Sequence, residues 1–250
     1  MKKKKLIISA TGFTFLLVGS FYSFKEQLNY GAHQRANYMR SPASIDHVEI
    51  SLIEKKREDV AKISLRLEML EQCYNEQVCG FDQSDSRSYA LAVGSAISKE
   101  LNEIYDKIQE GELVDSRYED LANHYLKIPD GHVKEEALNI LSTQPPSQKS
   151  FETIVDYALL YHDDALIEQS MTELLKYKET HENEIMNSFS KVLSTSSPMV
   201  REKLGSHIFP FLNERTYDQF ITFSTRLPKG SKTQIALKAA IRKYRYTNRL

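Results

Sequence analysis

The stretch YEDLANHYLKIPDGHVKEEALNILSTQPP, residues 118–146, decides the fold. Apolar residues recur at helical steps in its first half, at Leu121, Tyr125 and Ile128, and again after Asp130. Asp130 is a residue type that starts helices, and the proline pair at 145–146 stops the second half. The stretch therefore predicts two short helices joined by a turn, which is a helical hairpin.

The same hairpin pattern recurs three more times downstream. The first helices are expected to start at Tyr118, Phe151, Ile185 and Tyr217, at successive steps of 33, 34 and 32 along the chain. The second helices are expected to start at Asp130, Asp163, Ser197 and Gly230. Seven residues beyond these starts lie Ala137, Ser170, Leu204 and Leu237. A hairpin cannot bury its apolar face alone, so we expect the four to stack. The seams between helices should bury Leu121, Ile154, Phe189 and Phe220.

Two dipeptides early in second helices, Val133-Lys134 and Val200-Arg201, resemble the Val-Arg dipeptide of HEAT-like repeats. The resemblance covers residues 112–245, although the other two units carry Ala165-Leu166 and Thr233-Gln234 instead. A period near 34 also suits tetratricopeptide repeats, but their small packing residues and closing proline are not reproduced. The resemblance implies an irregular right-handed α-solenoid of about four hairpins, with a concave binding surface.

A longer helical hairpin is predicted upstream, over residues 45–111. Its first helix carries an apolar stripe at Ile53, Val60, Ile63, Leu67 and Leu70. Asp85 or Ser86 should cap its second helix, whose apolar positions include Leu91, Ile97, Leu101, Ile104 and Ile108, and which Gly111 should close.

Cys73 and Cys79 are the two cysteines of the chain. Their spacing matches neither a thioredoxin-type pair nor a standard zinc site. On one regular helix the two would face different ways, so a disulfide requires the helix to end near Cys73 and the chain to loop back, an ending that Gly80 supports. We expect a structural disulfide, with two free buried thiols and metal or redox chemistry as the alternatives.

Residues 1–24 have the pattern of a targeting segment. Lys2 to Lys5 precede an apolar run from Leu6 to Phe24, which is just long enough to span a bilayer as a helix. The lysines favour the cytoplasmic side, which puts the rest of the chain outside. We expect an uncleaved signal anchor over residues 1–24 and a tether over residues 25–44. Cleavage near Val18-Gly19-Ser20 and a soluble N-terminal helix are the alternatives.

No motif of catalysis or metal binding stands out. The chain has no Gly-x-Ser-x-Gly elbow and no His-Glu-x-x-His. His162-Asp163-Asp164 is interpreted as a helix cap rather than a metal or acid–base site, and His181-Glu182-Asn183-Glu184 as a solvated turn. We therefore predict no catalytic residue, no metal ligand and no cofactor.

The C-terminus is basic. From Lys229 to Leu250 there are seven basic residues and no acidic one, although the net charge of the chain is −1. Outside the cytoplasm such a segment suggests an anionic lipid, an acidic polymer or an acidic partner, and the alternative is a polar capping helix. The predicted partner- or anion-binding residues are Lys238, Arg242, Lys243, Tyr244, Arg245 and Arg249.

These observations predict an all-α protein with an N-terminal anchor, a hairpin with a Cys loop at 45–111, and solenoid repeats with a basic C-terminal helix at 112–250. The function that they favour is a membrane-anchored scaffold, inserted in the inner membrane through residues 6–24, with its C-terminal domain outside the cytoplasm (periplasmic). It would bind a protein partner in the cell envelope. One alternative is an envelope enzyme or accessory acting on cell-wall polymer. The other, a nucleic-acid binder using the basic tail, requires that the chain is not exported.

Overall fold

The computed structural model describes residues 47–248, of which residues 52–248 belong to one compact unit. The described residues are helical and contain no β-strand. The first helices of successive hairpins are α2 (His47–Glu76), α4 (Ser116–Tyr125), α6 (Gln148–Thr153) with the π-helical η1 (Ile154–Ala158), α8 (Glu182–Thr195) and α10 (Glu214–Arg226). The second helices are α3 (Ser86–Gly111), α5 (Gly131–Thr143), α7 (Asp164–Leu174) with the 3₁₀ turn η2 (Leu175–Tyr177), α9 (Pro198–His207) with the 3₁₀ turn η3 (Phe209–Phe211), and α11 (Lys232–Asn248).

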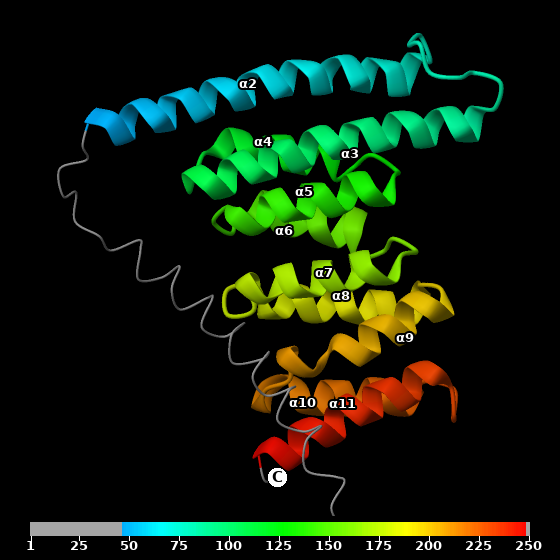
Figure 1. Ribbon diagram of the computed structural model, residues 1–250. Coiled ribbons are helices and arrows are strands. Elements are labelled where there is room, and N and C mark those ends of the chain that lie inside the picture. The colour runs from blue at the N-terminus through cyan, green and yellow to red at the C-terminus, as the bar shows by residue number, and fades with distance from the viewer. Residues whose placement is uncertain (1–46, 249–250) are drawn as a thin grey trace, which may run out of the picture. The chain divides into compact units, whose positions relative to one another are not determined.

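Successive hairpins pack in chain order, as Figure 1 shows. The second helices form one continuous layer, in which α3 contacts α5, α5 contacts α7, α7 contacts α9 and α9 contacts α11. First helices contact one another on the other side, α4 with α6 and α8 with α10. The predicted segments 45–111 and 112–250 therefore meet in this layer, at the interface between α3 and α5.

Each second helix begins at a side chain that caps it. Asp85, Asp130, Asp163 and Ser197 accept backbone N–H groups from the first turns of α3, α5, α7 and α9. In α11 the Oγ atom of Ser231 accepts the Gln234 N–H at 3.2 Å. The predicted start at Gly230 is thus one residue early, since Gly230 supplies the left-handed turn (φ 77°) that precedes the cap.

The buried residues of the first helices agree with the predicted stripe at three of four seams. Ile154, Phe189 and Phe220 are fully buried, but Leu121 is only partly buried. Ala122, beside Leu121 in α4, is fully buried. It lies as far beyond the N-cap Asp115 as Ile154 lies beyond Ser147 and Phe220 beyond Asn213. The buried seam residue of α4 therefore lies one position later in the sequence than the expected Leu121. Its spacing to Ile154, the seam residue of the next unit, is one residue shorter than expected.

The hairpin α2–α3 is closed by an apolar seam with polar pairs along its edge. Val60, Ile63 and Leu67 are buried, and Arg66 of α2 pairs with Glu100 (2.6 Å) and Glu103 (3.0 Å) of α3. Leu91, expected in the core, is 64% exposed. Tyr89 and Val93 take the buried positions, because they lie on the face of α3 that turns inward.

The end of α3 also differs from the expected one. Gly111 is the last helical residue, but the left-handed C-cap conformation is adopted by Glu112 (φ 48°). A tight approach also occurs at Gly94, where an added Cβ would lie 2.3 Å from a carboxylate oxygen of Asp130. The cap of α5 therefore sits directly on α3, and a larger residue at Gly94 would displace the Asp130 side chain.

Lys134, in the Val133-Lys134 dipeptide, lies inside the protein. It is 2% exposed, and its ammonium donates to the carbonyl of Leu126 at the end of α4. The Nζ atom lies 5.3 Å from the ring centroid of Tyr161 and 5.8 Å from that of Tyr157. Burial lowers the pKa of Lys134 to about 8.

The predicted signal anchor (1–24) and tether (25–44) lie outside the described residues. Among the helices of residues 47–248, none is long and apolar enough to cross a membrane.

Replacing Phe220 with Ala should lower the free energy of unfolding by about 3–5 kcal/mol, because a fully buried ring leaves a cavity between α10 and its neighbours. Replacing Tyr246, which is 78% exposed, with Ala should change it by less than about 0.5 kcal/mol. Chemical denaturation measures both values. Equal costs for the two variants would contradict the packing described.

Lys134 should make stability depend on pH. Its folded pKa of about 8 lies below the unfolded value of about 10.4, so between these limits the unfolded state binds more protons. The free energy of unfolding of the wild type, minus that of Lys134→Met, should therefore rise with pH from 8 to 10, by at most about 1.4 kcal/mol per pH unit. Chemical denaturation of both proteins at a series of pH values measures this difference. A difference that stays flat or falls as pH rises would show that the Lys134 ammonium is not desolvated.

Candidate functional site

The basic C-terminal helix is α11, the last helix of the second-helix layer. Leu237, Ala240 and Ile241 are buried on the inner side, and α11 packs mainly on α9. At Gly205 of α9 an added Cβ would lie 3.4 Å from the carbonyl oxygen of Thr233, which indicates a close approach of the two helices. One face of α11 is thereby fixed against the protein and the opposite face is left exposed.

The exposed face carries most of the predicted basic residues. Lys238, Arg242, Lys243 and Arg245 are all exposed. Ile235 (60% exposed) and Tyr246 (78% exposed) lie on the same helix. We call Ile235, Lys238, Arg242, Arg245 and Tyr246 the basic face.

The basic residues differ in their surroundings. The Lys243 ammonium lies 4.3 Å from the centroid of the Phe209 ring, a cation–π contact that ties it to η3. Within the described residues Lys238 and Arg242 form no ion pair or side-chain hydrogen bond. Arg249 lies outside the described residues. Among the predicted basic residues, Lys238 and Arg242 are therefore exposed and without an ion pair in the part of the chain that the structure describes.

Tyr244 does not belong to this surface. It is 9% exposed, and its ring lies 5.6 Å from that of Tyr217 in α10. A helical step of two positions turns the side chain through about 200°, just over half a circle, so Tyr246 faces solvent where Tyr244 faces the core. Tyr244 therefore packs against α10, and its predicted binding role stays a prediction.

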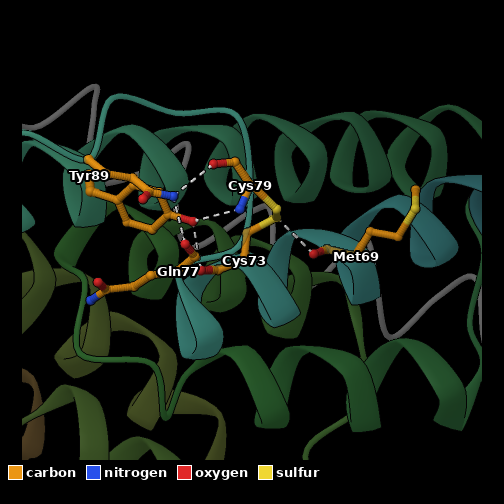
Figure 2. Close-up of a disulfide and its surroundings, with 6 residues drawn as sticks. Met69, Cys73, Gln77, Cys79 and Tyr89 are labelled. Carbon is orange, nitrogen blue, oxygen red and sulfur yellow. Dashed lines mark hydrogen bonds between the residues drawn. A yellow bond between two sulfur atoms is a disulfide. The ribbon is translucent and has the colours of Figure 1, made fainter.

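Cys73 and Cys79 form a disulfide, with their Cα atoms 5.3 Å apart (Figure 2). Helix α2 ends at Glu76, one turn beyond Cys73, and the chain then turns back through Gln77 in the left-handed conformation (φ 55°). The Gln77 N–H donates to the Cys73 carbonyl at 3.0 Å. The loop back was expected, and Gln77 makes the left-handed turn, three residues before the Gly80 that was taken to support the helix ending.

Tyr89 of α3 holds both ends of this Cys loop. Its hydroxyl donates to the carbonyl oxygen of Cys73 at 2.9 Å and accepts the N–H of Cys79 at 3.4 Å (Figure 2). The Tyr89 side chain is 2% exposed, and its ring meets Phe81 edge-on. The disulfide closes the Cys loop, and the buried Tyr89 hydroxyl attaches this loop to α3.

The two histidine-containing motifs serve the fold in different ways. Asp163 caps α7, as expected, and His162 is exposed. His181 is less solvated than expected, since its ring packs 4.8 Å from the Phe151 ring and its Nε2 atom lies 2.7 Å from the Gln148 side-chain oxygen. Within residues 47–248 no group of three or more His, Cys, Asp or Glu side chains could hold a metal ion.

A surface pocket that the sequence did not indicate lies between the end of α2 and the turn from α4 to α5. Its volume is about 240 Å³, and it is lined by Glu71, Tyr74, Asn75, His124, Lys127, Ile128 and Pro129. The Nε2 atom of His124 lies 2.8 and 2.9 Å from the two carboxylate oxygens of Glu71. Burial, together with Asp130 and Tyr161, raises the pKa of Tyr74. The lining comes from two distant parts of the chain, so no local motif could reveal it.

Comparisons with protein-family models, with curated proteins and with solved structures find no match to this chain.

Tyr89 and the disulfide should act as one unit. Tyr89→Phe removes the hydroxyl and leaves the Cys79 N–H without its acceptor, which should cost about 1–2 kcal/mol of stability. Replacing both cysteines with Ala should cost about 2 kcal/mol, because the loop that they close is short. Chemical denaturation measures the stability of Tyr89→Phe, of the double Cys→Ala variant and of the two combined. The loss of stability caused by Tyr89→Phe should be smaller when the disulfide is absent. Strictly additive costs would mean that Tyr89 does not stabilise the Cys loop.

Proposed function

We propose that this chain is a membrane-anchored α-helical repeat scaffold that holds an acidic protein partner in the cell envelope. The observation that carries the proposal is the basic face, where Lys238 and Arg242 have no acidic partner among the described residues and lie on the same helix as exposed Ile235 and Tyr246. Cations that are left unpaired around apolar side chains are suited to steering and then seating a partner of opposite charge.

The sequence and the disulfide together support a location outside the cytoplasm. Four lysines before the apolar run from Leu6 to Phe24 favour a signal anchor that leaves the rest of the chain on the outer side of the membrane. A disulfide such as Cys73–Cys79 forms and persists in oxidising compartments and is rare in the cytosol. Since the two observations concern different parts of the chain, they support the location independently.

We further propose that the fold is an irregular, right-handed α-solenoid of the HEAT-like kind. Val133 and Val200, which carry the resemblance, are both fully buried and both occupy the third position of a second helix. Their neighbours differ, since Lys134 is buried and Arg201 is partly exposed. Repeat proteins of this class bind partners along surfaces built from successive units, which agrees with a binding role.

Photocrosslinking in intact cells tests the proposal. A photoreactive amino acid in place of Ile235 should give a discrete crosslinked product. That product should weaken several-fold in the variant Lys238→Gln/Arg242→Gln, because the charges that attract the partner are gone.

The matched control is Lys99→Gln/Lys191→Gln, which removes two exposed lysines elsewhere, on α3 and α8, and should leave the product unchanged. In solubilised membranes, added salt should weaken the complex of the wild type more strongly than the complex of the Lys238→Gln/Arg242→Gln variant. The absence of a crosslink, or a crosslink that persists in that variant with the same salt dependence, would contradict the proposal.

A further inference from the structure

The pocket between α2 and the α4–α5 turn is a hollow on the surface that is open to solvent. Its two walls belong to different hairpins, and the α2 wall carries Tyr74 and Asn75 in the last turn before the chain folds back. Cys73, the preceding residue, is fixed by the disulfide and by the Tyr89 hydroxyl. The pocket wall is therefore held in place before any ligand arrives, which lowers the entropic cost of binding.

The charges around the pocket are not symmetrical. The carboxylate of Glu71 is engaged by His124 through both oxygens. Lys127 is exposed, forms no ion pair within the described residues, and lies 5.9 Å from the centroid of the Tyr157 ring. The side chain that remains available for an opposite charge is thus an ammonium, and it favours a carboxylate on the ligand.

The other groups favour a small polyhydroxyl ring as the body of the ligand. Tyr74, Ile128 and Pro129 offer apolar surface, while Asn75 and the Glu71–His124 pair offer hydrogen-bond donors and acceptors beside it. A volume of about 240 Å³ lies just below the range of about 300–1,000 Å³ typical of drug-sized ligands, so a single ring fits better than a longer chain. A pyranose has an apolar C–H face and a rim of hydroxyls, which is the complement of this lining.

We propose that this pocket binds one sugar-acid unit of an anionic glycan, with its carboxylate on Lys127, its apolar face on Tyr74 and its hydroxyls on Asn75 and the Glu71–His124 pair. The proposal goes beyond the scaffold function and does not depend on it, because the basic face is on α11 and shares no residue with the pocket.

Saturation-transfer NMR on the full-length protein, with galacturonic acid and galactose as probes, tests this inference. The two sugars differ only at C6, which is a carboxylate in galacturonic acid and a hydroxymethyl group in galactose. Galacturonic acid should bind in the millimolar range and about tenfold more tightly than galactose, which corresponds to one charge-assisted hydrogen bond. Tyr74→Ala should abolish the binding of both sugars.

Lys127→Met should remove the preference for galacturonic acid and leave weak binding of both sugars. Because Lys127 is exposed, this variant should fold normally even if Tyr74→Ala does not. The matched control is Lys191→Met, an exposed lysine of α8, which should keep the preference. The inference is overturned if neither sugar binds, if both bind equally well, or if Lys127→Met retains the preference. Tighter binding of N-acetylalanine, a mimic of a peptide terminus, would assign the pocket to peptides and would also overturn it.

Discussion

Each hairpin of this protein has an apolar side that it cannot cover by itself, and the contact between successive second helices is the interaction that the remaining structure depends on. The layer from α3 through α5, α7 and α9 to α11 is continuous, so each helix covers the one before it. Capping side chains at the starts of these helices fix where each begins. Among the described residues this layer ends at α11, whose outward side is the basic face.

The other end of the layer is α3, which is joined to α2 by the Cys loop. Helix α2 is the longest of the described helices, and its last turns extend to the Cys loop, where the disulfide and Tyr89 anchor it. That anchoring places Tyr74 and Asn75 against the α4–α5 turn and creates the pocket. The buried Lys134 lies beyond the same turn, between the end of α4 and the rings of Tyr157 and Tyr161. This end therefore combines the anchored Cys loop with the pocket and the buried Lys134.

The hairpins, their order and most of the seams could be predicted from the sequence, because caps, breakers and apolar spacing act within a few residues of one another. The errors have the same origin. At α4 the seam residue is Ala122, whose small side chain gives little signal beside Leu121, and at α11 helical rotation separates Tyr244 from Tyr246. The left-handed turn at Gln77 gives no signal in a local pattern that offers Gly80 nearby. The pocket joins residues 71–75 to residues 124–129, and such a contact exists only once α2 and α4 are placed side by side.

We propose that the chain acts outside the cytoplasm, in a compartment in which disulfides persist. A reporter enzyme that is active only outside the cytoplasm, fused after Leu250, measures the location most directly. The account predicts an active reporter that stays with the membrane fraction. A silent fusion that is stably expressed at full length would place the helical stack inside the cell and contradict the account.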